Sequence, residues 1–465
     1  MRARGPRTQG AIMAPSMITV GLVSLGCAKN LVDSEVMLGR LRRHGYNISL
    51  DPERADVVVV NTCGFLQSAK DEGYETIREM GRLKRQGRLR RLIVAGCMVQ
   101  RFADEMRRIL PEVDGFVGLN DVERIEEACA LETDTFVPDL GPAAYIPRED
   151  AGRILATSGA SAYLKISEGC DNPCAFCIIP KIRGRFRSRT IDSLRTEAQS
   201  LAASGVREIN LIAQDATSYG SDIGESGGLP ALLEALDTVS DLRWIRILYA
   251  YPSKVTTRLM DTMAAAARVI PYIDIPLQHA SKRVLSRMRR GGSAESFLRM
   301  IEAFRKRVPG ISLRTTLIVG FPGETEQDVA ELLDFVQEAR FDHLGVFTYS
   351  HEPGTAAHDL GDDVPEDEKL ARRDRVMTLQ HDISSELYSA RIGTRLLALV
   401  DGAPDEPEGP YRARAFFQAP DIDGSVLVHA AQELAVGDFL PVRVTDAGPY
   451  DLHAEPDGEP GTDAS

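Results

Sequence analysis

The sequence predicts an α/β protein of three domains: an open parallel α/β domain, a partial TIM-type barrel of six β-α units and a small C-terminal β-barrel. Three observations support this prediction. The chain has 465 residues, and domains usually hold roughly 150 residues each. Short apolar runs alternate with helical segments over most of the chain, as α/β domains require. After Arg391 the pattern changes to short β runs broken by Gly, Pro and Asp, which is typical of small barrels.

The first domain is expected at residues 18–135. Apolar runs followed by helical segments recur there, which favours parallel strands joined by helices. The expected elements, strand and helix in turn, are Ile18–Leu25, Asp33–His44, Val57–Val60, Gln67–Lys84, Leu92–Ala95 and Val99–Leu110. A stretch rich in Pro, Gly and acidic residues follows at 138–152, and it predicts a linker over 136–155.

The six-unit barrel is expected at residues 156–387, because the alternation of strand and helix resumes there. Its strand candidates are Tyr163–Ser167, Glu208–Ala213, Trp244–Tyr249, Tyr272–Pro276, Ser312–Val319 and Gly345–Tyr349. The charged segment 362–388 has a helical period and is expected to cap this barrel.

The small β-barrel is expected at residues 388–455. Its strand candidates are Leu396–Val400, Tyr411–Phe417, Ser425–His429 and Phe439–Val444. We expect disorder in the tails, residues 1–17 and 456–465; the second of these is acidic and rich in Gly and Pro.

Composition excludes several classes of protein. Apolar residues make up 43% and charged residues 26% of the chain, as in globular proteins. No stretch approaches the roughly 18 apolar residues of a membrane helix, and the N-terminus lacks the apolar region of a secretory signal. We therefore expect a cytoplasmic protein without a membrane partner; a transit peptide is the weaker alternative. The net charge of −13 disfavours a large nucleic-acid footprint.

Seven cysteines in a chain without a secretory signal favour metal ligands over disulfides. The clearest group is Cys170, Cys174 and Cys177, a C-x3-C-x2-C run directly after the first barrel strand. Thiolates at this spacing can hold three corners of a four-iron cluster, which leaves one iron open. A zinc knuckle or a structural role is the alternative, but zinc sites normally use C-x2-C pairs with a fourth ligand nearby.

A second group consists of Cys27, Cys63 and Cys97, each placed where an apolar strand ends and a helix begins. Because the carboxyl ends of parallel strands meet at one edge of a sheet, these thiols are expected to converge. Helix N-termini favour thiolates, so the pattern predicts a second three-thiolate cluster. Small buried residues at tight turns are the alternative. Cys129 has no partner at motif spacing and is expected in the core.

The run Cys170–Cys177, with the aromatic Phe176 before its last cysteine, resembles the radical S-adenosylmethionine superfamily, in which the open iron chelates the cofactor. With the second cysteine group and the terminal barrel, the chain resembles the methylthiotransferases, which combine an N-terminal cluster domain, a radical core and a TRAM domain. The resemblance covers nearly the whole chain. It includes the segments Ser24–Asn30, Asn61–Phe65, Gly320–Glu326 and Phe347–Thr355.

Within that family the chain resembles the RimO branch, which modifies an aspartate of small-subunit ribosomal protein twelve. The segments that carry this likeness are Ile182–Arg189, Ala213–Thr217 and Ile273–His279. Charge agrees with it, since residues 388–465 contain five Arg, no Lys and fourteen acidic residues, whereas phosphate contacts need cations. A basic protein would instead be attracted. A tRNA adenosine substrate is the alternative, and a noncatalytic iron–sulfur scaffold is a third hypothesis.

The resemblance implies that the β-carbon of the aspartate receives a methylthio group, with two [4Fe-4S] clusters and two S-adenosylmethionine molecules. One of these molecules is the radical source and the other the methyl donor. The Cys170/Cys174/Cys177 cluster would cleave the first to a 5′-deoxyadenosyl radical, and the other cluster would carry the sulfur. An electron donor such as flavodoxin or ferredoxin and a sulfur donor are implied as partners. Direct nucleic-acid binding is not expected.

Further site candidates accompany the cysteines. Phe176 is a candidate for contact with the cofactor, as are Gln214 and Asp215, because they lie at the carboxyl end of the second barrel strand, where barrel active sites form. Packing or capping is the alternative for the last two. Gly320 and Gly323 are expected to shape a tight turn. Four arginines are candidates for pairing with a carboxylate of substrate or cofactor: Arg183, Arg185, Arg187 and Arg189. Surface solvation is the alternative for them.

Overall fold

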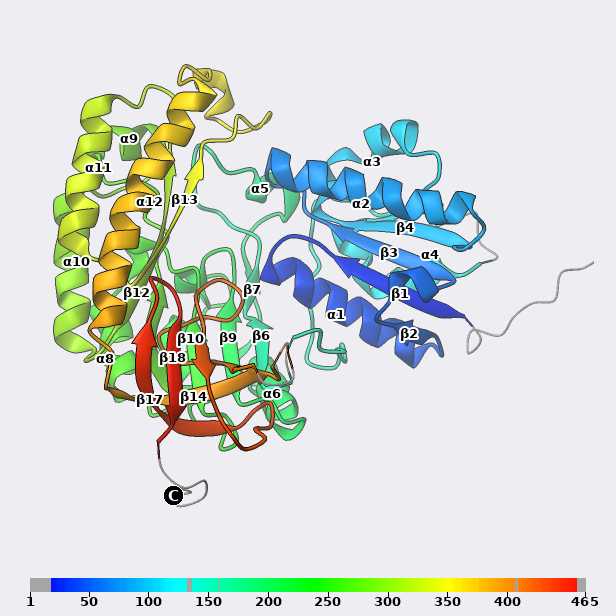
Figure 1. Ribbon diagram of the computed structural model, residues 1–465. Coiled ribbons are helices and arrows are strands. Elements are labelled where there is room, and N and C mark those ends of the chain that lie inside the picture. The colour runs from blue at the N-terminus through cyan, green and yellow to red at the C-terminus, as the bar shows by residue number, and fades with distance from the viewer. Residues whose placement is uncertain (1–17, 132–135, 158, 405, 407–408, 458–465) are drawn as a thin grey trace, which may run out of the picture. The chain divides into compact units, whose positions relative to one another are not determined.

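The computed structural model describes residues 18–131, 136–157, 159–404, 406 and 409–457 (Figure 1). The chain forms two compact units. The first runs to Tyr145 and includes Ala151–Ile154, and the second comprises Ile146–Asp150 and the chain from Leu155 onward. The predicted tail 1–17, and 458–465 of the other tail, lie outside the described residues.

The first unit is built on an open five-stranded parallel sheet in the order β2-β1-β3-β4-β5. Its elements are β1 Thr19–Ser24, α1 Ala28–Arg43, β2 Asn47–Ser49, β3 Val57–Thr62, α2 Gln67–Arg85, β4 Arg91–Gly96, α3 Cys97–Ile109, β5 Gly115–Val117 and α4 Ile125–Cys129. Strands β3 and β4 are buried throughout, as their continuous apolar runs predict. The predicted parallel domain is confirmed. Strands β2 and β5 were missed because three residues carry too little pattern.

The second unit contains a six-stranded parallel sheet in the sequential order β6-β9-β10-β11-β12-β13. All six predicted strands are present: β6 Ser161–Lys165, β9 Glu208–Ile212, β10 Trp244–Ile247, β11 Val269–Asp274, β12 Ser312–Val319 and β13 His343–Thr348. The helices that alternate with them are α6 Ile191–Ala203, α7 Gly228–Leu236, α8 Thr257–Ala265, α9 Lys282–Arg287, α10 Ala294–Arg307 and α11 Glu326–Ala339. A short α5, Ile179–Ile182, and the pair β7 Ser167–Glu168 and β8 Arg187–Ser188 follow β6.

The C-terminal part of this unit is a closed five-stranded barrel in the order β14-β15-β16-β18-β17. Its strands are β14 Arg395–Gly402, β15 Tyr411–Arg414, β16 Val426–Val428, β17 Phe439–Ala447 and β18 Leu452–Pro456. The four predicted strands are confirmed. The sequence did not predict β18, which closes the barrel by pairing with β17 and, in parallel, with β16.

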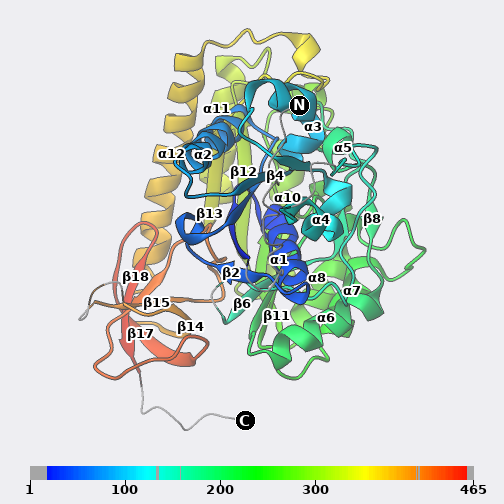
Figure 2. The ribbon, with the colours of Figure 1, turned by 90° about the vertical axis from the view of Figure 1, so that its right-hand side faces the viewer.

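Helix α12, Glu366–Ser389, corrects the expectation of a cap over the six-stranded barrel. It runs along α11 and β13 at the side of the sheet (Figure 2), and its buried Gln380 donates to the Phe341 carbonyl at 2.8 Å. The charge and helical period of this segment gave no sign of the narrow apolar stripe of Val376 and Ile383, which packs against the sheet.

The N-terminal end of the six-stranded barrel is closed by segment 414–423, which links β15 to β16. For example, Tyr272 Oη donates to Asp423 at 2.7 Å, and Arg246 donates to the Phe416 carbonyl at 2.7 Å. Each of the six strands contributes a polar contact to this segment, through Tyr163, Glu208, Arg246, Tyr272, Arg314 and His343. Polar side chains at the N-terminal end of the six-stranded barrel therefore hold the small barrel in place. The carboxyl end of the six strands remains available for a site.

Candidate active site

The loop Cys170–Cys177 lies at the carboxyl end of β6, as the sequence predicted. Three distant segments hold its backbone. Cys170 N donates to the Gly184 carbonyl at 3.2 Å, Ala175 N donates to Met288 at 2.8 Å, and Ala357 N donates to Ala175 at 2.7 Å. Main-chain hydrogen bonds to three separate segments thus hold the shape of the loop.

The thiols of this loop lie in a partly desolvated place. Cys170 is buried, while Cys174 and Cys177 are half-buried. Burial raises the pKa of Cys170 and raises the pKa of Cys177 to about 12, so a thiolate there needs a compensating cation such as iron. Among the described residues, no three His, Cys, Asp or Glu side chains converge closely enough for a single metal ion.

Asp215, predicted at the end of β9, reaches the cysteine loop through Asn172. Its carboxylate accepts from Asn172 Nδ2 at 2.7 Å and from Lys254 Nζ at 2.7 Å, and Lys254 also donates to Asn172 Oδ1 at 2.8 Å. Burial alone would raise the pKa of Asp215, but the hydrogen bonds and charge of Lys254 and Thr217 lower it. Asp215 is therefore an ionised brace for the loop.

Gln214, the neighbouring candidate, belongs to a separate buried network. Its amide donates to Glu168, which also accepts from Lys165 and Arg183 at 2.8 Å each. Burial alone would raise the pKa of Glu168, yet Arg183 and Lys165 lower it strongly. Gln214 Oε1 is buried and has no hydrogen-bond partner among the described residues.

The four candidate arginines have different environments. Arg183 pairs with Glu168, and Arg189 pairs with Glu197 in the interior, so both are neutralised within the protein. Arg185 is exposed, 3.4 Å from Asp171. Arg187 donates to the carbonyls of Arg183 and Arg185. The structure thus gives structural partners to Arg183 and Arg189 rather than leaving them for a substrate.

In the first unit, the three loops that carry Cys27, Cys63 and Cys97 are adjacent at the carboxyl edge of the sheet. A Cβ placed on Gly26 would lie 2.6 Å from Cys63 Cβ, and one on Gly64 would lie 2.8 Å from the Cys97 carbonyl. Cys27 is the N-cap of α1, and Cys97 is the first residue of α3. The three strands that precede these cysteines are neighbours in the sheet, as predicted, while the meeting of the three thiols stays a prediction. Cys129 lies in the core, where burial raises its pKa to about 12.

Comparison with known proteins identifies the family of the chain. An uncharacterized protein family, UPF0004, matches residues 19–118, the Radical SAM superfamily matches residues 164–336, and the TRAM domain matches residues 392–456. A protein of Pelotomaculum thermopropionicum named ribosomal protein uS12 methylthiotransferase RimO is 47% identical over 94% of this chain and 99% of its own. One of Symbiobacterium thermophilum with the same name is 46% identical over 96% of this chain and 92% of its own.

The chain belongs to the RimO family. It is a radical S-adenosylmethionine methylthiotransferase. The TsrM methyltransferase of Kitasatospora setae, whose structure holds cobalamin and a [4Fe-4S] cluster, shares the fold with a TM-score of 0.53 at 17% identity, covering 73% of this chain and 76% of its own. An iron–sulfur cluster and S-adenosylmethionine are the cofactors of this enzyme class.

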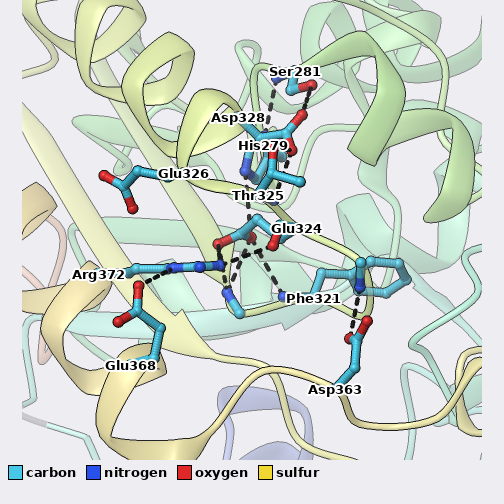
Figure 3. A network of polar contacts seen from close by, with 12 residues as sticks. His279, Ser281, Phe321, Glu324, Thr325, Glu326, Asp328, Asp363, Glu368 and Arg372 are labelled. Atoms are coloured by element: carbon cyan, nitrogen blue, oxygen red, sulfur yellow. Dashed lines mark hydrogen bonds and ion pairs between the residues drawn. The ribbon is translucent and has the colours of Figure 1, made fainter.

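The sequence also predicted a tight turn at Gly320 and Gly323, directly after β12. Gly320 and Gly323 both have positive φ, +74° and +75°, which confirms the tight turn. Glu324 folds back and accepts from Gly320 N at 2.9 Å and from Arg372 at 2.9 Å (Figure 3). Burial alone would raise the pKa of Glu324, but His279, Gly320 and Arg372 lower it.

Phe176 packs beside this turn in a small apolar cluster with Phe321 and Tyr349. The sequence missed two residues at the cysteine loop, Tyr251 and Arg290. Tyr251 Oη lies 3.9 Å from Cys174 Sγ, and Arg290 Nη1 lies 3.2 Å from the same sulfur. No sequence signal identifies them, because Tyr251 follows β10 and Arg290 follows α9, and only the fold brings them to Cys174.

Among the described residues, no helix is long and apolar enough to cross a membrane.

Proposed function

We propose that this enzyme transfers a methylthio group to the β-carbon of an aspartate in small-subunit ribosomal protein uS12. The observation that carries this proposal is the 47% identity to a uS12 methylthiotransferase over nearly the full length of both chains. The family likeness supplies the aspartate, the β-carbon and the use of two S-adenosylmethionine molecules, one as radical source and one as methyl donor.

We assign one [4Fe-4S] cluster to Cys170, Cys174 and Cys177, and a second to Cys27, Cys63 and Cys97. When bound, the two clusters would supply the electron that cleaves S-adenosylmethionine and the site that carries sulfur. The chain's own residues prepare these sites. Asn172, Asp215 and Lys254 brace the first loop, and its thiols are partly desolvated.

The charge of the small barrel favours a protein substrate over RNA. Four of its five arginines, including Arg395 and Arg443 with Asp457, lie within ion-pair distance of carboxylates. Cations already paired with acids cannot release counterions from a nucleic acid, so direct nucleic-acid binding is not proposed. We place the reaction in the cytoplasm, with flavodoxin or ferredoxin as the electron donor.

The decisive experiment reconstitutes the protein without oxygen and supplies S-adenosylmethionine, sulfide and a reductant together with either uS12 or unmodified tRNA. Mass spectrometry is expected to find one methylthio group on a uS12 aspartate. A methylthio group on a tRNA adenosine instead would overturn the proposed substrate. Production of 5′-deoxyadenosine with neither product would support the radical chemistry and contradict the proposed substrate.

The second cluster is tested by a matched pair of glycines in the first unit. Gly26 has φ +90° and lies against Cys63, whereas Gly87 has φ +74° and nothing within 4 Å of an added Cβ. Both Gly26→Ala and Gly87→Ala impose similar backbone strain, of about 1 kcal/mol, but only Gly26→Ala displaces a proposed ligand. We expect iron per reconstituted chain to fall from about eight toward about four in Gly26→Ala and to stay unchanged in Gly87→Ala. Equal iron in both variants would contradict a cluster at this edge.

A further inference from the structure

The turn after α9 brings one arginine onto the cysteine loop. Arg289 has φ +54°, a left-handed conformation that reverses the chain, and Arg290 N then donates to the Leu285 carbonyl at 2.8 Å. The Met288 carbonyl of the same turn accepts from Ala175 N at 2.8 Å. Because the turn and the cysteine loop are joined through their backbones, the position of Arg290 relative to Cys174 is fixed by the main chain.

Arg290 as a whole residue is only 9% exposed, and its side-chain contacts include a single thiol. Nη1 donates to Cys174 Sγ at 3.2 Å, Nη2 donates to the Pro276 carbonyl at 2.7 Å, and the guanidinium carbon lies 4.3 Å from the centre of the Tyr251 ring. In the described part of the chain, Nε has no hydrogen-bond partner and no carboxylate lies within ion-pair distance of Arg290.

A buried cation without an anion is costly, so this arrangement is balanced only when negative charge resides on the sulfur side. Two other cations beside the loop, Lys254 and the exposed Arg185, do not have this property, because Arg185 lies 3.4 Å from the Asp171 carboxylate. The Lys254 ammonium is 2.7 Å from the Asp215 carboxylate and is partly exposed, so its charge is already compensated. Arg290 is therefore the cation whose field is directed at the thiolates.

We infer that Arg290 is a positioning residue that raises the reduction potential of the cluster bound by Cys170, Cys174 and Cys177. This inference rests on the proposed cluster. In the reduction, one electron from an external low-potential donor enters the cluster, no covalent bond changes, and the cluster becomes one unit more negative. A fixed guanidinium and its N–H···S hydrogen bond stabilise the more negative state more than the less negative one.

The experiment measures the midpoint potential of this cluster by redox titration followed by electron paramagnetic resonance. The full chain is used with Cys27, Cys63 and Cys97 each replaced by Ala, so that one cluster gives the signal. We expect Arg290→Gln to lower the equilibrium constant for reduction at least tenfold, which is about 59 mV for one electron. Arg290→Lys, which keeps the charge, is expected to restore part of the shift. Arg289→Gln removes the same charge from the exposed neighbour and is expected to leave the potential unchanged.

Iron content separates the two ways in which the test can fail. If the parent chain binds no iron, the proposed cluster is wrong. If Arg290→Gln retains the parent's iron and has the parent's potential, the inference about Arg290 is wrong while the cluster stands. Should Arg290→Gln lose iron, Arg290→Met replaces it as the neutral variant, and an Arg290→Met chain with the parent's iron and the parent's potential would also overturn the inference.

Discussion

Two buried arginines at opposite ends of the six-stranded barrel have nearly the same surroundings. Arg246, at the N-terminal end, lies 4.4 Å from the Tyr272 ring centre and donates to the Phe416 carbonyl at 2.7 Å. Arg290, at the carboxyl end, lies 4.3 Å from the Tyr251 ring centre and donates to a carbonyl at the same distance. They differ in their anion, because Arg246 has the Glu208 carboxylate at 2.8 Å and Arg290 has a cysteine sulfur.

This difference separates a finished interface from a binding site. At the N-terminal end Glu208 and Asp401 neutralise Arg246 and Arg414 within the protein, and segment 414–423 closes the barrel. At the carboxyl end the charge of Arg290 has no carboxylate among the described residues. A buried charged group without a partner of opposite charge in its own protein indicates a site where a ligand binds.

Removing a thiol from the carboxyl end is expected to have the largest effect. Cys174→Ala should lower production of 5′-deoxyadenosine at least about 1,000-fold, because groups that act as a unit lose most of their effect when one is removed. Tyr163→Phe at the other end removes only weak contacts of 3.3–3.4 Å and should retain the activity. Chromatography of the nucleoside product measures both. Comparable losses in the two variants would erase the distinction between the ends.

At the N-terminal end the expected effect is on stability. Glu208→Gln leaves the buried Arg246 guanidinium facing a neutral amide, while Arg414 keeps Asp401. Breaking a buried pair in this way costs about 3–5 kcal/mol. Chemical denaturation measures the free energy of unfolding. Glu234→Gln, which removes an exposed partner of Arg258 at 3.8 Å, is the control and should change it by less than about 1 kcal/mol. If Glu208→Gln leaves the free energy of unfolding unchanged, the ion pairs of Glu208 do not hold the small barrel in place.

Acid should weaken the same interface. Burial alone would raise the pKa of Glu208, but the charges of Arg414 and Arg246 lower it to about 2, from an ordinary value of 4.5. Since the folded pKa is depressed, the contribution of Glu208 is fully present above pH 4.5 and is lost as the pH falls toward 2. The stability difference between the parent chain and Glu208→Gln should therefore shrink over that range, by at most about 1.4 kcal/mol per pH unit. Urea denaturation at pH 7, 4.5 and 3 measures it, and a constant difference would contradict the assignment.

The two ends also differ in how far the sequence predicts them. The carboxyl end is predictable because Cys170, Cys174 and Cys177 are local in sequence. In the first unit, by comparison, the strand-end position of Cys27, Cys63 and Cys97 follows from parallel topology. Closure by segment 414–423 is not predictable, since its partners come from six separate strands. Arg290 was missed for the same reason: its role depends on which sulfur the fold places beside it, and an arginine after a helix ordinarily indicates solvent.

The smallest expected effect concerns Asp215, where sequence left two roles open. As a brace, Asp215→Asn weakens the Asn172 and Lys254 contacts and should cost about 1–2 kcal/mol, discounted because Lys254 is partly exposed. Its cluster should lose iron to a chelator several-fold faster, as supporting partners of metal ligands usually change affinity 10-fold or more. Asp261→Asn, which removes an exposed pair with Arg307, is the control and should lose iron at the parent rate. If the Asp215→Asn variant keeps its iron but binds S-adenosylmethionine more weakly, Asp215 contacts the cofactor. The contacts with Asn172 and Lys254 would then describe Asp215 only when no cofactor is bound. Weak iron retention with unchanged cofactor affinity would instead show that Asp215 acts structurally, through its contacts with Asn172 and Lys254. Arg290 would then be the charged residue at this end that acts on the cluster.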